Sequence, residues 1–434
     1  MENVPKESDT IASKKAVRLA EKIGRTHVMI DMSKAWWADG PVEILGLLGV
    51  LAINFILIYP MIGKPSESLN FSGPVLPILA KAVSLTGAPF VYSIELVNII
   101  FFLAFPLTFY FFVKMVSGRR FSAFLAVLIA TLPFYLFAKT RFQTGVIGSE
   151  SPYIASLTVL PLALSALLNF LRVGGIKNLF IASLSVAFLS LISPFGTFIY
   201  IITSVITTFS EVLLGEGRLK ILRLITVYIF GTSLSSFWYN PSFVYWIIAG
   251  PMGEGVRFMI QKLIPLFLFI VPILASLGYL LFDRKPALQP LFLALFYTLA
   301  FLILVFTGKG FAPSSPERYT AIFGISLSFL LGIVVLNLVE YSKSHFPKIF
   351  FAAGAKEAVL IIISVSIAAL IIVWRSAILP GQSNVLGLWT NIEKGDVWIA
   401  RDQFGGNATS LPGYLITAIG GGTLVYLSRK SRVS

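Results

Sequence analysis

Long apolar runs alternate with short polar segments along the whole chain. Most of these runs are about as long as the ~20 residues that a helix needs to cross the hydrocarbon core of a bilayer. We therefore predict an all-α integral membrane protein with about twelve transmembrane helices. The predicted spans are residues 41–62, 94–115, 120–138, 153–171, 178–194, 196–214, 221–239, 263–282, 287–307, 319–341, 358–375 and 412–428.

One further apolar segment, residues 74–92, has the sequence PVLPILAKAVSLTGAPFVY and differs from the predicted spans. It contains three prolines, Gly87 and Lys81, and proline both removes a backbone donor and disrupts a helix interior. We expect this segment to form a surface helix of the first outer loop, which lies along the membrane or dips into it.

The composition supports the membrane class. Hydrophobic residues make up 56% of the chain and charged residues only 12%, whereas soluble proteins carry about 25% charged residues. A soluble protein with many buried helices would need more polar surface than this chain has. A soluble fold is therefore excluded.

Few residues are suited to bind a metal or a haem. The chain has no cysteine, which excludes disulfides and thiolate metal sites, and its two histidines, His27 and His345, lie in polar segments. A haem inside the membrane needs histidines at depth, so we expect no haem and no histidine-rich metal centre. We attribute the net charge of +14 to membrane topology and predict no nucleic-acid partner.

Lysine and arginine predict the orientation, because they favour cytoplasmic loops. With the N-terminus in the cytoplasm, the inner segments hold 22 basic residues and the outer segments 11. Two glycosylation acceptors, Asn70 and Asn407, then both fall on the outer side. We predict a multi-pass protein of the cell membrane with both termini in the cytoplasm.

Three parts follow from this map: a cytoplasmic tail at residues 1–40, a transmembrane core at 41–341, and a C-terminal helix pair at 342–434 with an outer loop at 376–411. In the tail, small and aliphatic residues recur at helical spacing among lysines and arginines. Such a helix would lie on an anionic cytoplasmic leaflet. A solvated tail without fixed structure is the alternative, and the sequence favours neither.

Charged residues in the predicted outer loops are the candidates for chemistry. They include Glu67, the group Lys139, Arg141 and Glu150, and the later Arg318. Converging loops would form a cavity at the headgroup level, where cations bind a lipid phosphate and a carboxylate acts as a base. The alternative is that these charges only meet water or extend to the membrane interface.

Three segments carry a resemblance to a known family. They are GRRFSAFLAVLIATLPFYLFAKTR at 118–141, LPLALSALLNFLR at 160–172 and SPERYTAIFGISLSFLLG at 315–332. Together with an outer loop at 63–93 that bears an acid, their arrangement resembles the GT-C class of polytopic membrane glycosyltransferases. The resemblance covers roughly residues 41–340.

This resemblance implies an activity and a role for each candidate. A sugar would pass from a polyprenyl-phosphate-linked donor to an acceptor at the outer membrane face. Glu67 would be the catalytic base, and Glu150 would help to position the acceptor or a divalent metal ion. Lys139, Arg141 and Arg318 would bind the lipid phosphate. Membrane lipids and other membrane or extracytoplasmic subunits are further candidate partners.

The chain also departs from the family pattern. The acids of the first two outer loops are reduced to Glu67 and Glu150, and no large soluble domain follows the spans. The alternative function is therefore a non-catalytic, cofactor-free subunit or anchor of a larger membrane complex. A transporter is disfavoured, because the predicted spans carry almost no charge at mid-depth and show no inverted repeat.

Overall fold

The computed structural model describes residues 41–59, 62, 73–142, 151–214, 219–241, 244–245, 249, 288–307, 316–345 and 411–433. In this part of the chain the regular structure is helical, and no strand occurs. The helices are α3 (Pro41–Ile58), α4 (Val75–Ser84), α5 (Phe90–Ser117), α6 (Arg120–Thr131), η2 (Tyr135–Lys139), α7 (Thr140–Phe142), α8 (Ser151–Val173), α9 (Ile176–Ile192), α10 (Pro194–Leu214), α11 (Leu219–Ser235), α14 (Gln289–Thr307), α15 (Pro316–His345) and α18 (Leu411–Val433).

Several of these helices could cross a membrane. Among the described residues, five helices are long and apolar enough, namely α5, α8, α10, α15 and α18, and the bent pair formed by α6 and the segment after it is a sixth candidate. The predicted class is therefore confirmed as an all-helical chain with several candidate membrane spans. Twelve spans are not confirmed. Two of the predicted spans, 263–282 and 358–375, lie outside the described residues.

Two other predicted spans are short. The helices α9 and α11 have 17 residues each, which is about 26 Å at the helical rise of 1.5 Å per residue.

The predicted surface segment 74–92 contains the ten-residue helix α4, which ends before the left-handed Gly87, and its last residues belong to α5.

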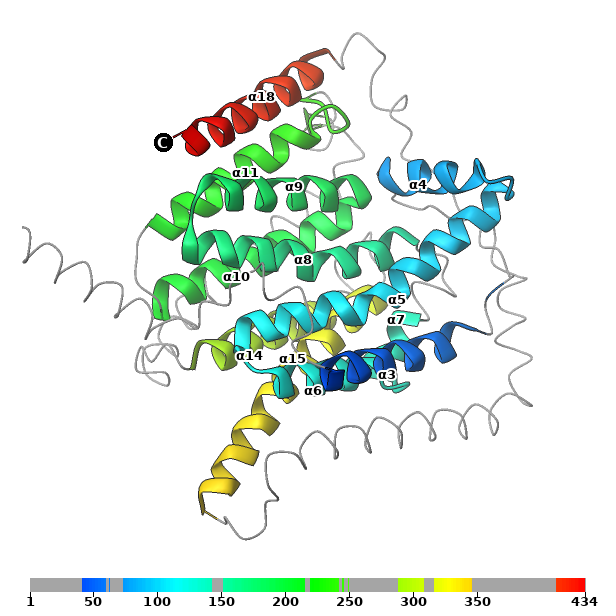
Figure 1. Cartoon of the computed structure of the whole chain (residues 1–434), viewed down its shortest axis with the longest axis vertical. Helices are drawn as coiled ribbons and strands as arrows, with labels where there is room; N and C mark the ends of the chain where they lie inside the picture. Colours follow the sequence, from blue (N-terminus) through cyan, green and yellow to red (C-terminus); the bar gives the residue numbers. More distant parts are fainter. Residues whose placement is uncertain are drawn as a thin grey trace, which may run out of the picture.

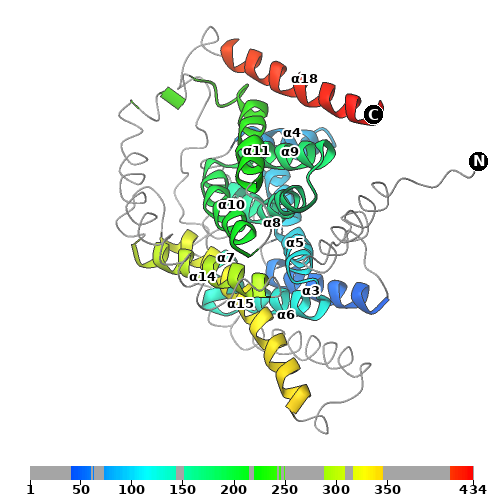
Figure 2. The same ribbon diagram turned by 90° about the vertical axis from the view of Figure 1, so that its left-hand side faces the viewer.

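The helices are stacked side by side. Figure 1 shows the succession α18, α11, α9, α8 and α5, and each helix contacts the next. Figure 2 shows α3, α6, α14 and α15 grouped away from α18, at the other end of this stack. A large apolar cluster fills the core between them, and many serine and threonine side chains and a few charged ones are buried as well. Dispersion and close packing hold such a core together, since lipid removes the hydrophobic drive between helices.

The helices α5 and α8 run parallel to one another. The Thr158 hydroxyl donates to the Phe101 carbonyl (2.7 Å), and Arg172 Nη1 donates to the Met115 carbonyl (3.4 Å). The two contacts are separated by the same number of residues on both helices. Positions along α8 can therefore be matched in depth to positions along α5.

Two buried carboxylates hold helix ends together. Glu43 of α3 pairs with Lys114 of α5 (2.6 Å) and lies 3.5 Å from Arg120. Glu211 of α10 pairs with Arg172 of α8 (2.9 Å) and with Lys220 of α11 (2.8 Å). Both clusters lie near the C-terminal ends of α5 and α8, which the basic-residue bias predicts to face the cytoplasm.

The predicted span at 120–138 is broken into two helical segments. The helix α6 ends at Thr131, and Leu132 is extended, with ψ 137°. Proline 133 explains the break, because it disfavours helical geometry in the preceding residue and lacks an N–H donor. After the bend of 72° the chain forms a π-helical turn, η2, in which Phe137 leaves helical geometry, and then the short helix α7.

Small residues attach α18 to α11. Gly413 and Gly420 lie against Ser236 and Ser233, and the Thr417 hydroxyl donates to the Ser233 carbonyl (2.9 Å). Small residues let helix backbones approach closely in membranes.

We expect Gly420→Leu to lower the thermal stability of the purified protein. A Cβ atom at Gly420 would lie 2.6 Å from Ser233 Cβ, and overpacking of this kind costs about 1–3 kcal/mol. Gly422→Leu is the matched control, because a Cβ there meets nothing within 4 Å. Melting temperatures in detergent measure both effects, and equal values for the two variants would contradict the packing.

Candidate functional site

Most buried cations of the described residues are paired with a carboxylate. Lys114 pairs with Glu43, and Arg172 and Lys220 pair with Glu211. Arg141 differs from these. It is only 2% exposed, and within the described part of the chain it bonds a neutral amide alone: Nη2 donates to Asn54 Oδ1 (2.8 Å).

The Arg141 guanidinium keeps unused donors inside the protein. Its Nε and Nη1 atoms are buried and have no hydrogen-bond partner among the residues that the structure describes. Its positive charge lies over two aromatic rings, 4.6 Å from the Phe102 centroid and 4.0 Å from the Phe105 centroid. These rings stabilise the cation through their quadrupoles, but they accept no hydrogen bond from Nε or Nη1 in the usual geometry.

Asn54 holds the guanidinium in place. Its Nδ2 donates to the Val50 carbonyl (3.1 Å) one turn earlier in α3, which orients Oδ1 toward Arg141. Because Asn54 carries no charge, the guanidinium is oriented without being neutralised. Asn54 is fully buried.

The contacts of Arg141 place it level with the middle of α5. Phe102 and Phe105 lie about halfway between Phe90 and Ser117, the ends of that helix. The interpretation of Arg141 as a cation in a solvated outer loop is therefore wrong. The break after α6 returns Arg141 into the helix bundle.

A buried and unpaired cation is costly. A single arginine at the centre of a membrane helix costs about 2.5–3.5 kcal/mol on insertion scales, and each buried donor without a partner costs about 1–3 kcal/mol. The fold retains this arrangement although it uses carboxylates elsewhere. Arg141 is therefore suited to bind an anion, and none of the carboxylates in the described part of the chain pairs with it.

A second unpartnered group lies on the face of α5 that carries Phe102. Asn98 is one helical turn before Phe102, and its buried Oδ1 has no donor. The free donors of Arg141 and the free acceptor of Asn98 therefore both lie beside this face of α5. A ligand with an anionic oxygen and a hydroxyl group would match them.

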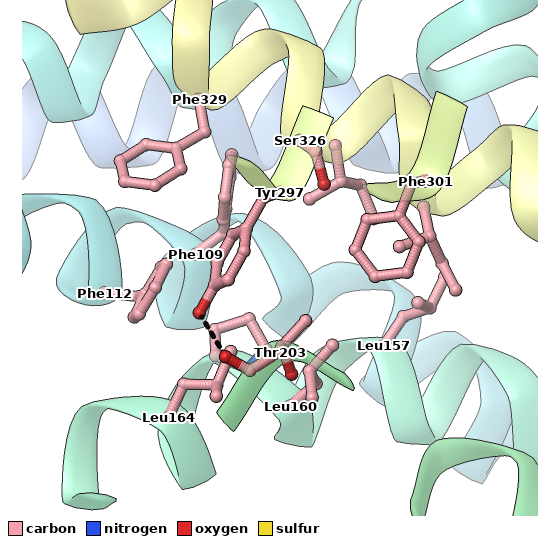
Figure 3. Close-up of a pocket in the computed structure, with 13 residues that line it drawn as sticks. Phe109, Phe112, Leu157, Leu160, Leu164, Thr203, Tyr297, Phe301, Ser326 and Phe329 are labelled. Carbon is pink, nitrogen blue, oxygen red and sulfur yellow. Dashed lines mark hydrogen bonds between the residues drawn. The ribbon is translucent and has the colours of Figure 1, made fainter. Parts of the chain in front are cut away.

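An apolar pocket lies between α5, α8, α10, α14 and α15 (Figure 3). Phe109, Leu160, Phe301 and Phe329 are among the side chains that line it, and its cavity volume is about 30 Å³. This volume has room for only a water molecule or two and is far below the roughly 300–1,000 Å³ that is typical of ligand pockets.

The structure places only some of the predicted site residues. Lys139 ends η2, and Arg141 follows in α7. Arg318 belongs to the first turn of α15, the helix that packs against η2 and α7, but its side chain is outside the description. Glu67, Glu150, Asn70 and Asn407 lie outside the described residues. Their roles, and the convergence of their loops, stay predictions.

No group of three histidine, aspartate or glutamate side chains that could hold a metal ion occurs within the described part of the chain. The two acids that the family resemblance implies, Glu67 and Glu150, are not part of that region. Whether a divalent metal ion binds beside them is therefore still a prediction.

Sequence reasoning did not identify Asn54, Phe102 and Phe105 as site residues. A signal for Asn54 was present, since it is a lone amide inside the apolar run LLGVLAINFILIY, and polar residues within spans mark functional sites. Nothing comparable distinguishes Phe102 and Phe105 from the other phenylalanines of the chain.

Comparison with known proteins adds no name to this site. No protein-family model matches the chain, and neither the curated proteins nor the solved structures compared with it gave a match. The resemblance to GT-C glycosyltransferases therefore stays a prediction from the sequence.

Proposed function

We propose that the protein is a multi-pass membrane glycosyltransferase that uses a lipid-phosphate-linked sugar donor at the outer membrane face, and that Arg141 binds the phosphate. The observation that carries this proposal is the buried guanidinium whose Nε and Nη1 atoms have no partner. A phosphate has the charge and the acceptor oxygens that these donors lack, and arginine binds phosphate through charge-assisted hydrogen bonds.

In the proposed reaction, the bond between the sugar anomeric carbon and the phosphate oxygen breaks, and a bond from an acceptor oxygen to that carbon forms. The phosphate leaves with the bonding electrons, so its negative charge grows, and Arg141 stabilises it. Glu67 accepts the proton of the acceptor group, and Glu150 positions the acceptor or a divalent metal ion. Lys139 and Arg318 are additional phosphate ligands.

The finer topology belongs to the same proposal. It includes about twelve spans in a GT-C-like arrangement, with both termini in the cytoplasm and with the acids on the outer side. The excess of basic residues in the inner segments supports it. The carboxylate clusters of Glu43 and Glu211 then lie toward the cytoplasm.

Bound lipid tests the proposal directly. We expect the wild-type protein, purified from membranes, to retain a lipid phosphate detectable by mass spectrometry, and Arg141→Gln to lose most of it. Hydrogen bonds to a charged group contribute about 1.5–3 kcal/mol, which corresponds to a loss of affinity of roughly 10- to 150-fold. Lys177→Gln is the matched control, because it removes the same charge from an exposed position of α9.

The same purification separates the alternative. A stoichiometric protein partner without any lipid phosphate would favour the non-catalytic subunit or anchor. Equal lipid phosphate in wild type and Arg141→Gln would remove Arg141 from the site.

A further inference from the structure

Two further buried side chains, on α5 and α8, have polar atoms without a hydrogen-bond partner. Asn98 of α5 is 6% exposed, and Ser151 of α8 is 2% exposed. The Asn98 Oδ1 atom and the Ser151 hydroxyl are both buried, and nothing in the described part of the chain bonds to either of them. Buried polar atoms are bonded in the large majority of cases. A group from outside the chain is therefore the natural partner of both.

Asn98 faces the same direction as the two rings beside Arg141. Successive residues of an α-helix are rotated by about 100°, so positions 98, 102 and 105 fall within about 60° of one another. The guanidinium lies over Phe102 and Phe105. Asn98 is therefore on the Arg141 side of α5, and the helical rise places it about 8 Å nearer to Phe90 than the level between the two rings.

Ser151 faces α5 from the neighbouring helix. It lies seven residues before Thr158, whose hydroxyl donates to the Phe101 carbonyl of α5 (2.7 Å), and residues seven apart share one face of a helix. The matched depths of α5 and α8 place Ser151 about one turn beyond Asn98. Arg141, Asn98 and Ser151 thus follow one another toward the helix ends that are predicted to face the outer side.

The three groups call for different chemistry in a ligand. The Nε and Nη1 atoms of Arg141 only donate and so bind the oxygens of an anion, whereas Asn98 Oδ1 only accepts. The Ser151 hydroxyl can both donate and accept. An ionised phosphate at Arg141 has no proton for Asn98 and leaves the rise of about 8 Å between them unfilled. Hydroxyl groups joined to that phosphate would supply both the reach and the donor.

We infer that Asn98 and Ser151 bind hydroxyl groups of the unit esterified to the phosphate, so that the ligand is a phosphate ester of a polyol such as a sugar. The phosphate lies at Arg141, and the polyol lies beside α5 and α8 on its predicted outer side. This inference rests on the proposed function, because it takes the phosphate site of Arg141 as given. It adds the location of the sugar and the two side chains that recognise it.

Substitutions that remove one partner of the hydroxyls test the inference. The probes are glucose 1-phosphate, mannose 1-phosphate and cyclohexyl phosphate, whose ring has no hydroxyl, and binding is measured by calorimetry on the full chain in phosphatidylcholine nanodiscs. We expect Asn98→Leu and Ser151→Ala each to bind at least one sugar phosphate about 2- to 10-fold more weakly than wild type, the usual effect of one neutral hydrogen bond. Both variants should bind cyclohexyl phosphate as wild type does. They come from different helices, and each is compared only if it elutes as a single folded species.

Ser122→Ala and Asn337→Leu are the matched controls. Ser122 of α6 also has a buried hydroxyl that no described residue bonds, but it follows Arg120 closely, at the other end of the bundle. Asn337 lies at an exposed position of α15. We expect wild-type affinity for all three probes in both controls. A control that weakens sugar phosphate binding as much as Asn98→Leu overturns the inference, because the loss is then not specific to the site.

Octyl glucosyl phosphate, a diester with a hydrocarbon chain, separates a lipid-linked sugar from a free sugar phosphate. Its partitioning into the bilayer is common to all variants, so only its dependence on Asn98 and Ser151 is compared. Weaker binding of the diester in both variants supports a lipid-linked ligand. Weaker binding of the monoesters alone keeps the polyol site and removes the lipid-linked donor of the proposed function.

Unchanged affinity for both sugar phosphates and the diester in Asn98→Leu and in Ser151→Ala overturns the inference. The phosphate site of the proposed function still stands in that case if Arg141→Gln loses cyclohexyl phosphate binding. Equal cyclohexyl phosphate affinity in wild type and Arg141→Gln removes that site as well.

Discussion

Replacement of Glu67 by glutamine is expected to slow sugar transfer by on the order of 10²–10⁴, the usual loss on removal of a positioned general base. Glu67 is the only carboxylate of the predicted outer loop at 63–93. The substitution keeps the size and the hydrogen-bonding shape of the side chain and removes its charge. Its effect on stability should be small, since a loop acid near water contributes little.

The measurement is glycan transfer in membranes that carry wild type, Glu67→Gln or Glu150→Gln at matched protein levels. Glu150→Gln is the comparison, because it makes the same change in the second predicted outer loop. We expect the loss to be larger for Glu67→Gln. Transfer at the wild-type rate would exclude Glu67 as the base and favour the non-catalytic subunit.

Replacement of Asn54 by aspartate should abolish most phosphate binding without unfolding the protein. A carboxylate in place of Oδ1, 2.8 Å from Arg141 Nη2, would neutralise the guanidinium. The fold already uses such pairs, as between Glu43 and Lys114. We expect dodecyl phosphate affinity to fall about 10- to 150-fold, equivalent to the roughly 1.5–3 kcal/mol of a hydrogen bond to a charged group.

Two measurements separate charge from structure in this variant. The melting temperature should stay the same or rise, because a buried cation gains a counter-charge while only the Asn54 bond to Val50 is lost. Asn337→Asp is the control, since it adds the same charge at an exposed position of α15. Wild-type phosphate affinity in Asn54→Asp would show that Arg141 serves only the packing of α3, α5 and α7.

Apolar run length predicted the helices well where lipid or apolar neighbours surround them. The runs at 94–115, 153–171 and 196–214 correspond to α5, α8 and α10. The reason is local, because a backbone in hydrocarbon must satisfy its own hydrogen bonds and does so as a helix. Run length did not predict the break within 120–138, where Pro133 follows the end of α6 inside an equally apolar sequence.

For the site, the sequence indicated the residue types and not their surroundings. Arg141 was predicted to bind a lipid phosphate from its loop and its family resemblance, and it was placed at the headgroup level. In the structure its contacts are with Asn54, Phe102 and Phe105, which are far from Arg141 in the sequence. No local sequence pattern shows that the segment after the break turns back into the bundle.

The sequence by itself determined the membrane class and most of the helices, because each depends on composition within a single segment. An excess of basic residues on one side of the membrane is still a prediction. The tertiary structure decided which buried cations are neutralised. Lys114 and Arg172 meet carboxylates of other helices, whereas Arg141, as far as the described residues extend, meets an amide and two aromatic rings. Charge pairing depends on distances between segments, and only the packing of α3, α5 and the broken helix sets those distances.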